Sequence, residues 1–144
     1  MDIGKRSFGF CRKLNTIDFH DGLQRIGHEA FYYSALKEIN IPDSVTAIAS
    51  DILLACSSLE SLKIPFIGNN EQNSKFSYIG YFFGDKTNTQ NPSSVPGKLE
   101  NINITRANKF SKNSFNGCTN LKVLHIPANL TEIGESVFEK CTKI

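Results

Sequence analysis

The sequence predicts a repeat solenoid of the α/β class, with a parallel β-sheet of about five to six short strands on one side and short helical or irregular turns on the other. The first observation is a repeated sequence motif, which we call the phrase. It reads F-N-G-C-T-N-L-K-V-L-H-I-P at residues 115–127, recurs in altered form at residues 8–19, 31–42 and 53–65, and begins again at residues 138–144. The second is an Ile-Gly pair five residues before the aromatic residue of the phrase, at residues 3–4, 26–27 and 133–134. The resulting period of 22 to 23 residues is typical of stacked repeats.

The second half of the phrase, L-x-x-I-x-I, predicts a short strand, because apolar residues two apart fall on the same face. Proline follows at Pro42, Pro65 and Pro127, and it ends a strand because it has no N–H group to donate. The side chains predicted to face inward are Leu14, Ile17 and Phe19; Leu36, Ile39 and Ile41; Leu59, Leu62 and Ile64; and Leu121, Leu124 and Ile126. Stacking of the repeats would place equivalent strands about 4.8 Å apart and bury a continuous core.

The first half of the phrase, I-G-x-x-x-F-x-x-C, is too short for a long helix. We expect one or two helical turns, or 3₁₀ structure, on this side of the solenoid. Another strand motif begins at Leu99, so the chain holds five complete strands and a sixth repeat that stops before its strand.

Three motifs carry a family resemblance: I-G-x-x-A-F at residues 26–31, C-x-x-L-x-x-L-x-I-P at residues 56–65, and x-S-V-T-x-I at residues 43–48. They resemble the BspA-like leucine-rich repeats, which occur in surface proteins of host-associated bacteria and in some protists. The resemblance covers nearly the whole chain and implies a leucine-rich-repeat solenoid. It also implies a cell-surface or secreted location. Because the family shares an architecture and no common reaction, the resemblance implies no cofactor.

One repeat is enlarged, at about residues 66–98. The strand motif that starts at Leu59 is followed by the next one 40 residues later, which is 17 more than the period of 23. The extra residues form two polar loops around an aromatic run, residues 76–83. Two interpretations stay open for this run: an exposed anchor patch, or packing of Phe82 and Phe83 into the core in place of the usual repeat phenylalanine. We expect the second, with residues 69–73 and 86–93 exposed and mobile.

At 144 residues the chain is one domain by length, and its 40% apolar content is enough for a core. A net charge of +2 and the lack of a dense Lys/Arg block argue against nucleic acid as a partner. No apolar run approaches the 18 or so residues of a membrane span, so we expect no membrane insertion. The chain enters a repeat at its first residues, and neither end offers the polar cap that solenoids use. The sequence shows no secretory signal, so the protein is either cytosolic or a fragment of a longer secreted chain, and we expect the fragment.

The cysteines Cys11, Cys56, Cys118 and Cys141 all fall at one position of the repeat, where the second repeat has Ser34. No Cys-x-x-Cys pair is present, so the spacing does not indicate zinc. We expect a column of buried thiols that act as small apolar side chains.

The histidines, His20, His28 and His125, lie at different offsets without metal-ligand spacing, and we expect exposed imidazoles. A Cys–His nucleophile pair stays open as an alternative, although Cys118 is predicted to be buried and His125 exposed. The sequence contains no phosphate-binding loop or nucleophile elbow, and we expect no enzymatic activity.

The outward positions of the strands are the predicted recognition surface, because solenoids bind partners on such faces. By alternation they are Thr16 and Asp18, Glu38 and Asn40, Ser61 and Lys63, Asn101 and Asn103, and Val123 and His125. A plain solvated sheet face is the alternative. With the family resemblance, we expect a non-catalytic module that binds a protein ligand, such as a host-matrix or cell-surface protein, in adhesion or cell interaction. The second hypothesis is a structural spacer within a larger surface protein.

Overall fold

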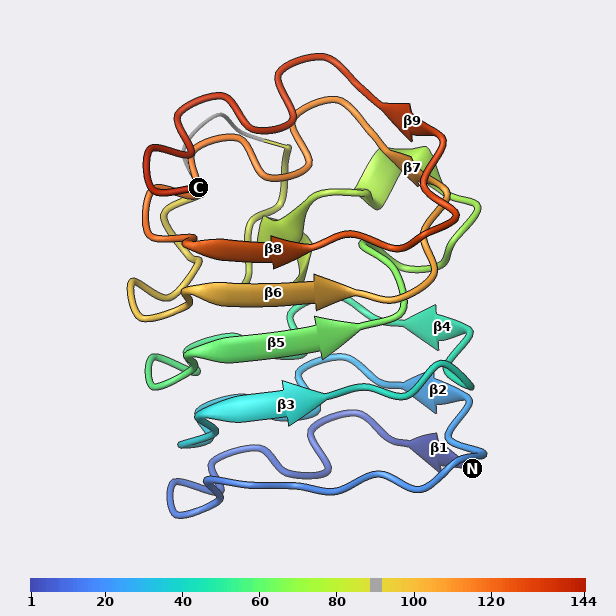
Figure 1. The fold of residues 1–144 in the computed structure, drawn as a ribbon. Helices are drawn as coiled ribbons and strands as arrows, with labels where there is room; N and C mark the ends of the chain where they lie inside the picture. Colours follow the sequence, from blue (N-terminus) through green and yellow to red (C-terminus); the bar gives the residue numbers. More distant parts are fainter. Residues whose placement is uncertain (89–91) are drawn as a thin grey trace.

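The computed structural model describes residues 1–88 and 92–144, and it shows a parallel-strand β-solenoid of about six turns. The chain enters at the lower right of Figure 1 and winds upward, one repeat per turn. The front of the solenoid is a four-stranded parallel sheet in the order β3 (Glu38–Asn40), β5 (Ser61–Ile64), β6 (Asn101–Ile104) and β8 (Val123–His125). Each of these four strands lies within an L-x-x-I-x-I motif, as the period-2 pattern predicts.

Two smaller parallel sheets form the right-hand corner in Figure 1. The lower one joins β1 (Asp2–Ile3), β2 (Arg25–Ile26) and β4 (Ala47–Ile48), and the upper one joins β7 (Lys109–Phe110) and β9 (Glu132–Ile133). Glycine follows β2 because a Cβ atom at Gly27 would lie 2.7 Å from the backbone of Gly4 in the turn below. The Ile-Gly pair of the sequence thus lies at a corner where consecutive turns leave no room for a side chain.

The back of the solenoid is built from turns that contain residues in the left-handed backbone conformation, instead of the expected helical turns. Every turn except that of the enlarged repeat contains two residues with positive φ, four positions apart: Arg6 and Phe10, Glu29 and Tyr33, Asp51 and Ala55, Asn113 and Gly117, and Ser136 and Lys140. Left-handed residues break a helix, and most of their N–H groups donate to a carbonyl of the turn above, as Phe10 does to Tyr32 (2.7 Å) and Tyr33 to Leu54 (3.1 Å). We call this set of bonds the turn ladder. The repeat is too short for a helix and gains its backbone bonds from its neighbour.

Helical structure occurs only in the enlarged repeat, among the described residues. Two short 3₁₀ helices lie there, η1 (Ser74–Phe76) and η2 (Ile79–Phe82). Helix η2 takes the place of a turn in the turn ladder. The Asp51 backbone N–H group donates to the Tyr81 carbonyl (3.0 Å), and the Ile79 N–H group donates to the Ser114 carbonyl (2.9 Å). Phe82 and Phe83 are fully buried, which confirms that the aromatic run packs into the core.

The loops of the enlarged repeat are partly as expected. Glu71, Gln72 and residues 86–88 are exposed, whereas Asn69 is half-buried and its carbonyl accepts a bond from Ile48 (2.9 Å) at the corner sheet. Residues 89–91 of the predicted loop lie outside the described residues, and the mobility of both loops stays a prediction. Tyr81 is buried, its hydroxyl donates to the Ile48 carbonyl (3.3 Å), and burial raises its pKa to about 12.

The predicted inward side chains line the core in the inner turns. Ile39, Leu62 and Ile102 are in register across β3, β5 and β6, and all are buried. In the two outer turns Leu121 is buried, and Leu14, Ile17, Phe19 and Leu124 pack half-buried against the core, so the inward prediction is wrong there only for Ile126. Residues 14–19 form no strand, so the front sheet has four strands instead of five, and Ile126 is 53% exposed.

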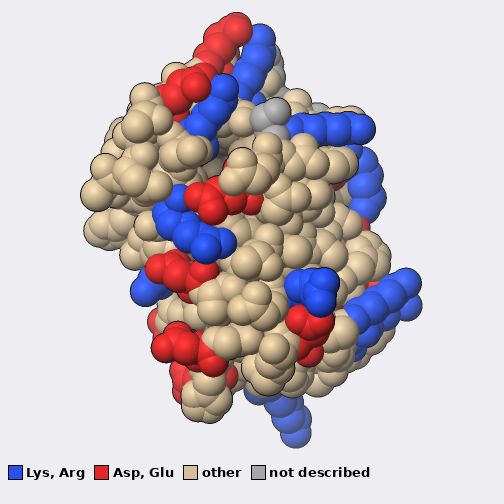
Figure 2. All heavy atoms as spheres, turned by 90° about the vertical axis from the view of Figure 1, so that its right-hand side faces the viewer, with Lys and Arg blue, Asp and Glu red and all other residues tan. Residues whose placement is uncertain are grey.

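Ion pairs between consecutive turns cover the right-hand corner. Asp2 pairs with Arg25 (3.1 Å) on β1 and β2, and Lys109 pairs with Glu132 (2.6 Å) on β7 and β9. Figure 2 shows acidic and basic side chains lying next to each other over this face. Exposed pairs of this kind stabilise a fold weakly. The balanced charge gives this corner no large field of one sign.

Candidate binding surface

The outward residues of the front sheet form two continuous rows. The first row joins Glu38, Ser61, Asn101 and Val123, and the second joins Asn40, Lys63, Asn103 and His125. Each row runs across all four strands because the strands are parallel and in register. We call the two rows together the ladder face. Ser61 and Asn103 are half-buried and the other six residues are exposed.

The first turn does not extend the ladder face as a strand. Thr16 and Asp18 are exposed as predicted, but they lie in a segment that forms no strand. A bond from the Lys37 N–H group to the Asn15 carbonyl (3.3 Å) connects this segment to β3. With no turn below it, the segment lacks a second neighbour that would hold it extended.

The ladder face is hollowed where the strands begin. A depression of about 400 Å³ lies between the first turn and β6, lined by Asn15, Thr16, Lys37, Glu38, Glu60, Ser61 and Asn101. These side chains offer hydroxyl, amide and carboxylate groups together with one ammonium group. At the upper edge, Lys122 pairs with Glu100 (2.9 Å). The depression is suited to polar groups that both donate and accept hydrogen bonds.

The cysteines form the predicted column in the inner and upper turns. Cys56, Cys118 and Cys141 are buried, and the Ser34 hydroxyl lies 3.3 Å from the Cys56 sulfur in the turn above it. Cys56 also donates to the Phe31 carbonyl (3.1 Å), as Cys141 does to Phe115 (3.1 Å). The prediction is wrong for Cys11, which is exposed because none of the described residues packs below the first turn.

Thiol labelling distinguishes these environments. Burial raises the pKa of Cys118 to about 12 and also raises the pKa values of Cys56 and Cys141. A raised pKa lowers the fraction of reactive thiolate at pH 8. We expect a disulfide reagent to label one thiol rapidly in the native protein and all four in denaturant. The Cys11→Ser variant should lose the rapid phase, whereas rapid labelling of two or more thiols would contradict the buried column.

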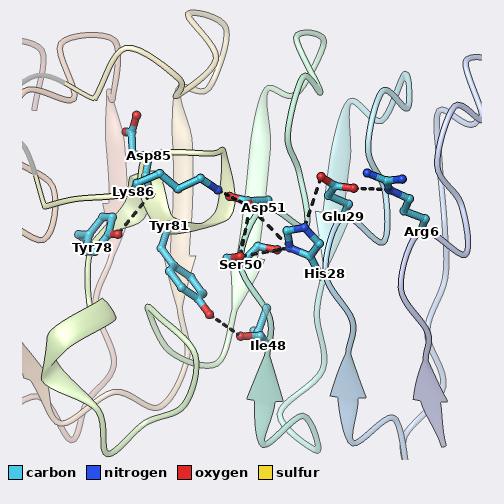
Figure 3. A network of polar contacts seen from close by, with 10 residues as sticks. All are labelled: Arg6, His28, Glu29, Ile48, Ser50, Asp51, Tyr78, Tyr81, Asp85 and Lys86. Atoms are coloured by element: carbon cyan, nitrogen blue, oxygen red, sulfur yellow. Dashed lines mark hydrogen bonds and ion pairs between the residues drawn. The ribbon is translucent and has the colours of Figure 1, made fainter.

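A polar network on the back joins the enlarged repeat to the third turn (Figure 3). The Asp51 carboxylate is buried, and Lys86 reaches over it with its ammonium group 2.6 Å from Oδ2. Ser50 donates to the same oxygen (3.2 Å). Lys86 is exposed as predicted, but it is held in place by this ion pair. Losing the Lys86 ammonium group would leave the buried Asp51 carboxylate without its compensating charge.

The same network continues through His28 of the second turn to Arg6 of the first turn (Figure 3). The imidazole Nδ1 lies 3.0 Å from the Ser50 carbonyl, and Nε2 lies 3.3 Å from the Glu29 carboxylate. Arg6 donates to Glu29, and this bond lowers the pKa of the Glu29 carboxyl group. His20 and His125 are exposed as predicted, but His28 is half-buried. No sequence motif marks this network, since the contacts that join its turns link residues 22 to 35 positions apart.

The network connects consecutive turns of the solenoid. Cys118 and His125 do not form a pair, because Cys118 is buried behind the sheet and His125 is exposed on its outer face. Among residues 1–88 and 92–144, no cluster of three or more His, Cys, Asp or Glu side chains could hold a metal ion. The same part of the chain has no helix with the length and apolarity needed to cross a membrane.

The family comparison agrees with the repeat structure. The model of the BspA type leucine-rich repeat region matches residues 1–89 and 94–144, in six copies. No curated protein sequence matches the chain significantly. The chain also matches two solved structures. The crystal structure of a leucine-rich repeat protein from T. pallidum has a TM-score of 0.54 at 19% identity, with 99% of this chain and 71% of that chain covered. A leucine-rich repeat protein from Bacteroides ovatus has a TM-score of 0.43 at 21% identity, with 99% of this chain and 56% of that chain covered.

Proposed function

Since the chain belongs to the BspA-type leucine-rich-repeat family, we propose that it is a non-catalytic binding module that holds a protein ligand on its ladder face. The observation that carries the proposal is the pair of rows that run in register across β3, β5, β6 and β8. Repeat proteins bind partners on laddered faces of this kind, because each strand adds one further contact of the same geometry.

The chemistry of the ladder face favours a folded protein with a mixed polar surface. Glu38 and Lys63 provide charges of opposite sign, and the central residues Asn101 and Asn103 are amides that both donate and accept. A uniformly positive surface would favour nucleic acid or an anionic membrane. The ladder face carries charges of both signs instead. We propose that the ligand is a host-matrix or cell-surface protein and that binding serves adhesion at the cell surface.

A double substitution in the second row tests the proposal. Lys63→Glu combined with Asn103→Glu places two carboxylates in the centre of the ladder face, on exposed and half-buried positions that the core does not use. We expect the parent protein to bind at least one member of a panel of purified matrix and cell-surface proteins in a surface-plasmon-resonance assay. The double variant should bind it about tenfold more weakly or worse.

The control is Lys140→Glu, a similar change of charge on an exposed residue of the last turn, away from the ladder face. It should leave binding unchanged, and circular dichroism should show that both variants are folded. Equal binding by the double variant and the parent would exclude the ladder face as the site. A folded parent that binds no member of the panel would favour the structural spacer instead.

A further inference from the structure

An exposed aromatic cluster lies on the back of the first two turns, away from the ladder face. Phe10 is 56% exposed and Tyr33 is 44% exposed, and their rings stack nearly in parallel with centroids 5.8 Å apart. Tyr32 meets both rings edge-on, at 4.9 and 5.1 Å. The Arg12 guanidinium lies over the Tyr33 ring, 5.5 Å from its centroid. We call these four residues the aromatic patch.

The fold does not require aromatic residues at these positions. The turn ladder aligns Phe10 with Tyr33 and Tyr33 with Ala55, and the same left-handed position is Gly117 and Lys140 in later turns. Alanine, glycine and lysine can therefore all occupy this left-handed backbone position. A bulky aromatic residue with positive φ is disfavoured. Side chains that are exposed, strained and unnecessary for the core are typical of binding sites.

The composition of the patch is that of an interface hot spot. Tyrosine and arginine are enriched among the residues that contribute most to protein binding. The stack also has an open end, because Ala55 is exposed and offers only a methyl group where the next ring would lie. A ring from a partner could take this third place and continue the stack of Phe10 and Tyr33.

The charge around the patch selects the partner. Arg12 and Lys13 are both exposed, and neither takes part in the ion pairs found among the described residues. An acidic ligand would complement this charge, whereas a second copy of the chain would bring the same positive groups against it. We propose that the aromatic patch binds an acidic peptide segment of a partner protein, with an aromatic side chain of that segment placed over Ala55. This surface is separate from the ladder face, and the proposal does not depend on it.

Fluorescence anisotropy with synthetic polymers tests this partner chemistry. The probe is a labelled copolymer of glutamate and tyrosine, and the comparison probes are a glutamate homopolymer and a copolymer of lysine and tyrosine. We expect the glutamate–tyrosine copolymer to bind, the homopolymer to bind about tenfold more weakly, and the lysine copolymer not to bind. Binding should weaken as salt is raised, because part of it is electrostatic.

Two variants locate the binding on the patch. Tyr33→Ala removes the stacked ring, and Ala55→Tyr fills the open place with the residue that the turn below already carries. Each should weaken binding of the glutamate–tyrosine copolymer about tenfold or more. The matched control, Lys140→Tyr, places the same residue at the equivalent position of the last turn and should leave binding unchanged. Thermal melting establishes that each variant is folded, and Tyr33→Ala decides the question alone if Ala55→Tyr does not fold.

Three results would overturn the proposal. The first is equal binding of the copolymer by the parent and Tyr33→Ala. The second is no binding of the copolymer by the folded parent. The third is a Tyr33-dependent interaction of another kind, either with a neutral oligosaccharide or between copies of the chain in sedimentation. Lys63→Glu with Asn103→Glu on the ladder face should leave copolymer binding intact, so failure of this proposal and failure of the ladder-face proposal can be told apart.

Discussion

Replacing Phe83 by alanine is expected to lower the free energy of unfolding by about 3–5 kcal/mol. The side chain is fully buried and directly follows η2, which stands in for a whole turn between the third turn and the turn at residues 113–117. Truncation leaves a cavity at the point where the enlarged repeat is held in the stack. For a domain of this size, such a loss lowers the melting temperature by roughly 10 °C.

The matched control for Phe83→Ala is the same substitution at an exposed phenylalanine. Phe10→Ala removes an equally large ring that is 56% exposed, and it relieves a positive φ at a bulky residue. Its effect on unfolding should stay within about 1 kcal/mol. A pair of melting curves measures both changes. An equal loss in the two variants would mean that η2 does not anchor the enlarged repeat.

Replacing Leu62 by alanine is expected to cost about 2–5 kcal/mol, because its side chain lies in the middle strand of the core with turns above and below. Leu124 occupies the same repeat position in β8 but is half-buried, so Leu124→Ala should cost only about 1–2 kcal/mol. His125→Ala, on the outer face, should change stability by less than about 0.5 kcal/mol. Urea unfolding of the three variants measures the order. A loss at Leu124 equal to that at Leu62 would contradict the one-sided burial of the last turn.

The inner turns could be predicted from the sequence because every residue there meets the same residue of the next repeat. The alternation of L-x-x-I-x-I placed Ile39, Leu62 and Ile102 in the core and the ladder face outside it. The outer turns could not be predicted in this way, because the motif at Cys11 or Ile126 is the same as elsewhere while a neighbour is missing on one side. Burial in a solenoid depends on both neighbours, and the motif describes only one repeat.

The back of the molecule was less predictable for a different reason. Residues such as Glu29, Asp51 and Asn113 adopt left-handed conformations although they are not glycine, the residue that usually indicates this conformation in a sequence. What stabilises them is the set of bonds to the next turn, which are contacts between residues 21 to 30 positions apart. The aromatic patch was missed for a related reason: Phe10 and Tyr33 belong to a phrase whose aromatic residues mostly face the core. Only the register of the turns separates Phe8 and Phe31, which pack inward, from Phe10 and Tyr33.

The enlarged repeat has a mechanical consequence. Most contacts of the solenoid join one turn to the next, so a molecule pulled apart would give way turn by turn, each step releasing one period of chain. Around the enlarged repeat the contacts reach further: Thr105 bonds back to Asp43, 62 residues away, Arg106 bonds back to Val45, 61 residues away, and Lys86 pairs with Asp51. Under force, the chain between these points would stay closed until several bonds failed at once. A stretched molecule would therefore lengthen in small even steps from its outer turns and then in one long step at its centre.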